Sequence, residues 1–142
     1  MRPETLPAAV PDNRGANLFH ADPAFASYLQ LYLPPALYAH LAPHLAELGR
    51  MAGAELDDLA ATADRNPPVL KHRTRGGEDR QSIEKHPAYR RLEEVAFGQY
   101  GLAAMSHRGG VLGWPQPMPP AAKYALTYLY VQAEFGVCCP LS

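Results

Sequence analysis

Apolar residues recur at three- and four-residue steps along most of this chain, which predicts a mainly helical fold. The clearest case begins near Pro35, where leucines occupy positions 37, 41, 45 and 48. This spacing places all four side chains on one face of a helix. Pro43 must kink or restart this helix, because it cannot donate the backbone hydrogen bond of a helix interior.

Another helix is predicted just before it. Asp22 supplies a capping carboxylate and Pro23 suits the first helical turn, so the helix should begin there. It should end before the proline pair at 34–35, because the residue that precedes a proline disfavours helical backbone angles. The residues expected on its inner face are Phe25, Tyr28, Leu29 and Tyr32.

Three more helices follow from the same period. Leu56 and Leu59 begin a short amphipathic helix, with Asp57 and Asp58 facing outward, and Pro87 opens the next helix. The inner stripe expected for that helix is Leu92, Val95, Ala96, Gln99, Leu102 and Ala103. The last helix, 121–135, is apolar nearly all round, so we expect it at the centre of the fold. Its side chains expected to be buried include Tyr124, Ala125, Tyr128, Leu129 and Phe135.

One segment breaks the helical period. Residues 69–86 are polar, alternate weakly and carry Gly76-Gly77 at their centre, which predicts a β-hairpin, since tight hairpin turns need positive φ angles. The predicted fold class is therefore mainly α with one small β-hairpin. Residues 1–21 are expected to form an extended arm anchored by Leu18 and Phe19, and residues 22–142 the helical domain.

Composition and charge limit the classes of partner that this chain is expected to bind. The chain has 142 residues, of which 47% are hydrophobic and 19% charged, and its net charge is -1. It therefore has no global basic field that would recruit nucleic acid or a membrane. The N-terminus lacks the pattern of a signal peptide, and the apolar run 121–131 is too short to span a bilayer. These features predict a cytoplasmic protein without membrane contact.

The histidines and cysteines complete no catalytic or metal-binding motif. His40 and His44 have the i,i+4 spacing of a zinc-binding helix, but the glutamate of the H-E-x-x-H pattern is missing and Pro43 separates them. Cys138 and Cys139 are adjacent, which disfavours a disulfide between them, and we expect two small buried thiols. No catalytic, cofactor-binding or metal-binding residue is therefore assigned to this chain.

The hairpin carries the one concentrated basic feature, which consists of Lys71, Arg73, Arg75 and Arg80. Such a cluster can contact phosphate groups. Three acidic residues dilute it, at positions 78, 79 and 84, and no aromatic residue is interleaved for base stacking. Contact with other subunits or solvent is the favoured interpretation, and contact with nucleic acid is the alternative.

Three stretches carry a family resemblance. They are NLFHADPAF at 17–25, NPPVLKHRTRGGEDRQSIEKHPAYRRL at 66–92 and LTYLYVQAEFGVCCPLS at 126–142. Together they resemble the N-terminal region of the acyl-CoA dehydrogenase superfamily, in particular its AidB-like alkylation-response branch. In that family this region is a helical first domain, followed by a β-barrel-like middle domain and a C-terminal helical bundle.

The resemblance implies a role within a larger protein. It implies that the chain stops before the flavin-binding middle domain, with Pro140 beginning the segment that leads into it. It also implies that the complete protein is an FAD-dependent oxidoreductase acting on an acyl-CoA, whereas this chain alone binds no FAD and catalyses nothing. The implied partners are the remaining domains, the other subunits of a homo-oligomer (a tetramer in the family) and acyl-CoA, with DNA as an alternative partner. A stand-alone helical interaction domain is the remaining alternative.

Overall fold

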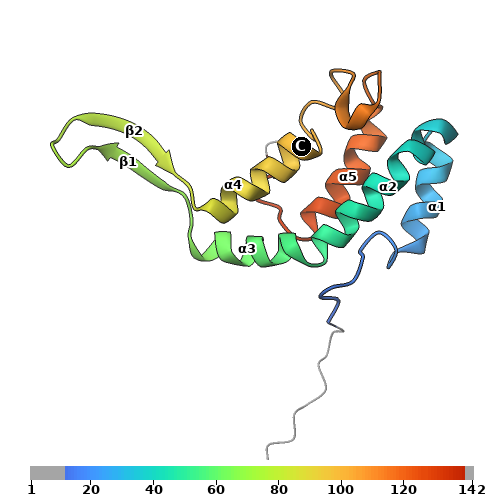
Figure 1. The fold of residues 1–142 in the computed structure, drawn as a ribbon, viewed down its shortest axis with the longest axis horizontal. Helices are drawn as coiled ribbons and strands as arrows, with labels where there is room; N and C mark the ends of the chain where they lie inside the picture. The colour runs from blue at the N-terminus through green and yellow to red at the C-terminus, as the bar shows by residue number, and fades with distance from the viewer. Residues whose placement is uncertain (1–11, 140–142) are drawn as a thin grey trace, which may run out of the picture.

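A computed structural model describes residues 12–139, so predictions on 1–11 and 140–142 lie outside the described residues. Within this range the helices gather into a bundle, and a two-stranded hairpin projects from one end of it (Figure 1). The mainly helical fold with one small hairpin is confirmed. The elements are α1 (Pro23–Tyr32), α2 (Pro35–Ala52), α3 (Glu55–Arg65), β1 (Val69–Arg73), β2 (Asp79–Glu84), α4 (Pro87–Glu93), the π-helix η1 (Glu94–Gln99), the short η2 (Val111–Gly113) and α5 (Pro120–Val131).

Helix α2 is the centre of the bundle. Its predicted leucine face is confirmed, since the side chains at 37, 41, 45 and 48 are all buried. The helix continues through Pro43 as one element, and Pro43 itself is exposed. Helix α5 packs alongside α2, while α3 and α4 contact each other below and beside them (Figure 1). The core therefore lies between α2, α4 and α5.

Helix α5 is only half buried, which corrects the expectation of a central helix. Ala125 and Leu129 are buried as predicted, but Tyr124 is 54% exposed, Tyr128 44% and Phe135 66%. The helix also ends at Val131, four residues earlier than predicted. An all-round apolar pattern shows that every side of the helix suits burial. Here α2 and α4 cover one side of α5, α1 reaches only Tyr128 at its edge, and Tyr124 is left open.

Helix α1 lies at the edge of the bundle, and its predicted inner face is partly wrong. Asp22 caps it as expected, through a carboxylate oxygen 3.0 Å from the backbone nitrogen of Phe25. Leu29 is buried and Phe25 packs against the core. Tyr28 and Tyr32, however, are 60% and 74% exposed. A helix at an edge buries a narrow stripe, so the flanking tyrosines stay outside.

The π-helix η1 changes which residues after α4 face the core. Leu92, Val95 and Ala96 are buried as predicted, but Gln99 is exposed and Tyr100 is buried in its place. The backbone nitrogen of Tyr100 bonds to the carbonyl of Val95, five residues earlier, so each turn holds an extra residue. Leu102 is buried as predicted, whereas Ala103 is exposed.

The segment that precedes α1 is tied to the C-terminal half of α2. Phe19 is buried and Leu18 packs against the core, as predicted. Backbone nitrogens of Gly15 and Leu18 donate to the carbonyls of Gly53 and Gly49, at 2.6 and 3.0 Å. A Cβ at position 53 would lie 1.9 Å from the carbonyl oxygen of Ala16, so only glycine permits this approach.

Candidate functional site

The hairpin brings together the four predicted cationic residues, and its register sorts its side chains onto two faces. Lys71 pairs with Ser82 and Arg73 with Asp79, while Val69 pairs with Glu84. Because side chains alternate across a strand, these six residues share one face. A bulge interrupts the ladder between Lys71 and Arg73, where β2 inserts an extra residue and Gln81 has a φ of 46°.

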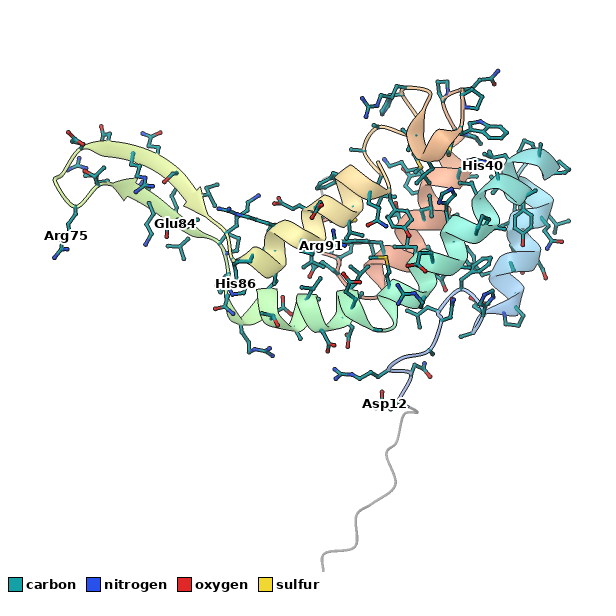
Figure 2. All side chains as sticks on the ribbon, viewed as in Figure 1. Asp12, His40, Arg75, Glu84, His86 and Arg91 are labelled. Atoms are coloured by element: carbon teal, nitrogen blue, oxygen red, sulfur yellow. The ribbon has the colours of Figure 1, made fainter. Side chains whose placement is uncertain are left out.

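Acidic partners neutralise part of this charged face. Lys71 Nζ lies 3.5 Å from Glu84 Oε2, and Arg73 Nε lies 3.4 Å from Asp79 Oδ1. Both pairs are exposed, so each contributes at most about 1 kcal/mol to stability. Arg75 extends from the tip into solvent (Figure 2). Two of the four predicted site residues therefore face a carboxylate, and the hairpin presents a mixed surface rather than a cationic stripe.

The opposite face of the hairpin carries one apolar cross-strand pair. Leu70 and Ile83 are cross-strand partners and are 51% and 58% exposed. His72 follows Leu70 on the same face by strand alternation. Which residues of β1 lie opposite which residues of β2 depends on the register across the bulge, and the sequence of one strand does not specify that register.

The root of the hairpin is fixed to α4. Lys85 forms an ion pair with Glu93, and both side chains are 30% exposed. The Lys85 ammonium also lies 5.1 Å from the centre of the Tyr89 ring, within cation–π range. These contacts hold the base of the hairpin against α4, while its strands project away from the helices (Figure 1).

His40 and His44 are packed side chains rather than paired metal ligands. Their ring centres are 5.5 Å apart, and His40 Nε2 bonds to the carbonyl oxygen of Leu112 at 2.9 Å. The Trp114 ring lies 5.2 Å from the His40 ring and packs against the core. Burial, and to a lesser degree the neighbouring His40, lower the pKa of His44. Among residues 12–139 no group of three histidine, cysteine or acidic side chains is placed to hold a metal ion.

The two cysteines differ in environment. Cys138 is buried as predicted, whereas Cys139 is exposed, which corrects the expectation of two buried thiols. Burial, with a smaller contribution from Glu134, raises the pKa of Cys138 to about 11. Cys138 therefore remains a neutral thiol near pH 7 and acts as a small apolar side chain.

Two uncovered apolar helix faces are the further surfaces that the structure reveals. On α5 and just beyond it, the exposed side chains are Tyr124, Tyr128 and Phe135. On α1, Leu31 is 78% exposed and lies between Tyr28 and Tyr32 in sequence. Large exposed aromatic and aliphatic side chains that gather on one helix face are typical of contact surfaces. No helix in the described range is long and apolar enough to cross a membrane.

Comparison with known proteins places this geometry in a family. The family model of the adaptive response protein AidB N-terminal domain matches residues 9–142. The apo-form of Bd2924 superposes with a TM-score of 0.69 over 82% of this chain, at 27% sequence identity. Caenorhabditis elegans ACDH-11, solved in complex with C11-CoA, superposes with a TM-score of 0.72 over 96% of this chain, at 18% identity.

The chain spans 22% of the Bd2924 chain and 23% of the ACDH-11 chain. No curated protein matches it. The family model covers nearly the whole sequence, and the helical fold agrees with that of ACDH-11. The chain therefore belongs to the family of the adaptive response protein AidB N-terminal domain.

Proposed function

We propose that this chain is the N-terminal scaffold domain of an FAD-dependent, acyl-CoA dehydrogenase-like flavoprotein. In the complete protein it walls one side of the acyl and flavin cavity and contacts neighbouring subunits. Family membership supports this assignment, as does the similarity in fold to ACDH-11, which was solved with C11-CoA bound. The reaction proposed for the complete protein is oxidation of the Cα–Cβ bond of an acyl-CoA thioester.

The observation that carries the proposal is the uncovered face of α5. Tyr124 and Tyr128 stand one turn apart on this helix and are about half exposed, with Tyr128 also in contact with Phe25 of α1. Leu129 on the other side is fully buried. Full burial of a large apolar side chain contributes roughly 1.5–3 kcal/mol, so this face favours a covering partner. An aromatic wall of this kind suits an acyl chain or a planar ring on its other side.

The residues of this chain fit one wall of such a cavity but not the reaction itself. FAD in the complete protein would supply the hydride acceptor, which no amino-acid side chain provides. Tyr124 and Tyr128 would exclude water from that side and restrict the position of the acyl chain. The base that removes a proton and the groups that hold the flavin are proposed to come from the remaining domains.

The hairpin is proposed as a contact between subunits or domains of a homo-oligomer. Its apolar pair, Leu70 and Ile83, suits a protein surface better than a phosphate backbone. The partly neutralised face with Lys71 and Arg73 weakens the case for DNA, because binding through phosphates requires unopposed cations. The same hairpin would then join copies of the protein rather than read nucleic acid.

The experiment uses the complete parent protein and the visible absorbance of its flavin. Purified protein should carry FAD, and addition of an acyl-CoA under anaerobic conditions should bleach the flavin band. Tyr124→Glu should reduce flavin retention or acyl-CoA bleaching at least tenfold, because a carboxylate would be buried in the wall. Phe97→Glu, which alters an exposed aromatic residue on η1, is the matched control and should leave both unchanged. A parent protein without flavin, or equal effects of the two variants, would contradict the proposal.

A further inference from the structure

The outer face of α1 has a pattern of small and large side chains that fits a second copy of itself. Ala24, Ser27, Tyr28 and Leu31 follow the i, i+3, i+4, i+7 spacing and occupy one side of the helix. They line a shallow groove with a volume of ≈ 330 Å³. This side is opposite the stripe that holds the buried Leu29. The groove is therefore a solvent-facing surface at the edge of the bundle (Figure 1).

Two α1 helices packed antiparallel about a twofold axis would place small residues against large ones. With the axis between Ser27 and Tyr28, Ala24 of one copy faces Leu31 of the other, and Ser27 faces Tyr28. Both pairs follow from the same axis, so the whole face is self-complementary, as a twofold contact requires. Facing large and small residues interdigitate without voids and let the helices approach closely.

Charge also favours this partner. Helix α1, with the sequence PAFASYLQLY, contains no charged residue, so two copies bring no like charges together at the axis. Antiparallel packing sets the two helix dipoles in opposite directions, which is the favourable arrangement. Exposure of Tyr28 and Leu31, at 60% and 78%, leaves the large side chains free to enter the facing groove.

We propose that the Ala24–Leu31 face of α1 forms an isologous contact with α1 of a second copy of this chain. This contact goes beyond the proposed function, because it holds whether or not the complete protein is a flavoprotein. One ten-residue helix buries less surface than a stable interface needs, so the chain alone should form a weak dimer whose population depends on concentration. In an assembly with further contacts, the same face would fix the orientation of two subunits.

Cysteine cross-linking tests the register of this contact. In a Cys139→Ser background, the double variant Ala24→Cys with Leu31→Cys should form a covalent dimer under mild oxidation. The two positions in one helix are about 10 Å apart, too far for a disulfide within one copy. Each single variant is the control, because equivalent positions in the two copies are about 10 Å apart along the helix axes. Equal cross-linking of single and double variants would overturn the register.

Sedimentation equilibrium tests the association itself. Leu31→Glu should raise the dissociation constant of the dimer about tenfold or more, since it removes a buried leucine from each half of the contact. Leu31 is largely exposed in one copy, so the variant should keep the circular dichroism spectrum of the unsubstituted chain. Ala103→Glu changes an exposed residue outside α1 and the hairpin and should leave the α1 dimer unchanged. A chain that stays monomeric at all concentrations would overturn the proposal. If other domains cover Leu31 in the complete protein and the double cysteine variant of that protein forms no covalent dimer, the proposed α1 contact is also overturned.

Discussion

The hydroxyl of Tyr130 donates a hydrogen bond to the carbonyl oxygen of Leu92 at 2.9 Å, and both residues are fully buried. Tyr130 belongs to α5 and Leu92 to α4, so one polar contact joins two helices across the core. A buried hydroxyl without a partner is costly, so this bond restricts how the two helices can slide along each other.

Removal of this hydroxyl should weaken the domain. Tyr130→Phe keeps the ring but leaves the Leu92 carbonyl without its side-chain donor, and we expect a loss of about 1–3 kcal/mol in the free energy of unfolding. Urea denaturation followed by circular dichroism measures it. Tyr124→Phe, on the exposed face of the same helix, is the control and should change stability by less than about 0.5 kcal/mol. Equal effects would contradict the role of the bond.

Alkaline pH should destabilise the chain through its buried phenols. Burial is the main cause that raises the pKa of Tyr130, and burial followed by the nearby Glu47 raises the pKa of Tyr100 to about 12. Above pH ~10 the unfolded chain releases these protons while the folded chain retains them. The contribution of these tyrosines to stability is therefore complete below pH ~10 and falls above it, by about 1.4 kcal/mol per pH unit for each tyrosine.

Comparison of the unsubstituted chain with Tyr130→Phe isolates this contribution. The free energy of unfolding of the variant should fall less steeply above pH ~10, by one tyrosine's share of the slope. Cys138, whose pKa burial raises to about 11, contributes with the same sign and is present in both proteins, so the difference reports Tyr130 together with its coupling to Cys138. Parallel pH profiles would show that Tyr130 ionises as easily in the folded chain as in the unfolded one.

Leu129→Ala should destabilise the domain by roughly 2–5 kcal/mol, because Leu129 is fully buried and its loss leaves a cavity. Thermal and urea unfolding of the 142-residue chain measure this change. Tyr124→Ala alters the exposed face of the same helix and should cost far less in the isolated chain. A cost below about 0.5 kcal/mol for Leu129→Ala would place the buried face of α5 outside the core.

Gly53→Ala should detach the segment that precedes α1. An added methyl group would meet the Ala16 carbonyl oxygen, so we expect a loss of about 1–3 kcal/mol and faster proteolysis near residue 16. Gly76→Ala in the hairpin tip is the matched control, because a Cβ there would meet only a Thr74 side-chain atom at 3.7 Å. Proteolysis at equal rates in both variants would argue against the close approach.

Replacing Lys71, Arg73 and Arg75 together by alanine in the complete protein tests the two proposed roles of the hairpin, subunit contact and DNA contact. We expect weaker assembly, detected by sedimentation, with little change in DNA affinity. If the hairpin bound DNA through phosphates, the affinity would fall steeply with salt in the parent and less steeply in the variant. Arg65, Arg90 and Arg108, which are exposed cations outside the hairpin, supply a control triple alanine variant. Lost DNA binding with intact assembly would favour the nucleic-acid interpretation.

The sequence predicted the parts of the fold that depend on local chemistry. The leucine spacing of α2 and the cap at Asp22 are both determined within a few residues, and the structure confirms both. Local chemistry could not predict that Tyr100 is buried instead of Gln99. The π-helix that causes this shift adds one residue per turn and has no distinctive sequence signal.

The candidate surfaces were predicted only in part, for two physical reasons. The cations of the hairpin could be read from the sequence, but their carboxylate partners depend on the register around the bulge at Gln81. The exposure of Tyr124 depends on which element covers α5, and a hydrophobic pattern does not specify that partner. Local chemistry thus identified the elements, and tertiary packing decided which sides of them remain open.

The contact between Phe25 and Tyr128 has a consequence for the order of folding. The two rings lie 4.6 Å apart, and the Tyr128 hydroxyl reaches Asp22 at 3.3 Å across 106 residues of sequence. Contacts between distant residues form late, because a long loop must close before they gain any stability. During synthesis on the ribosome, α1 can pack against α2 early, but Phe25 lacks its Tyr128 partner until α5 emerges. The side of α1 that faces Tyr128 is therefore completed only after the last described helix has been made.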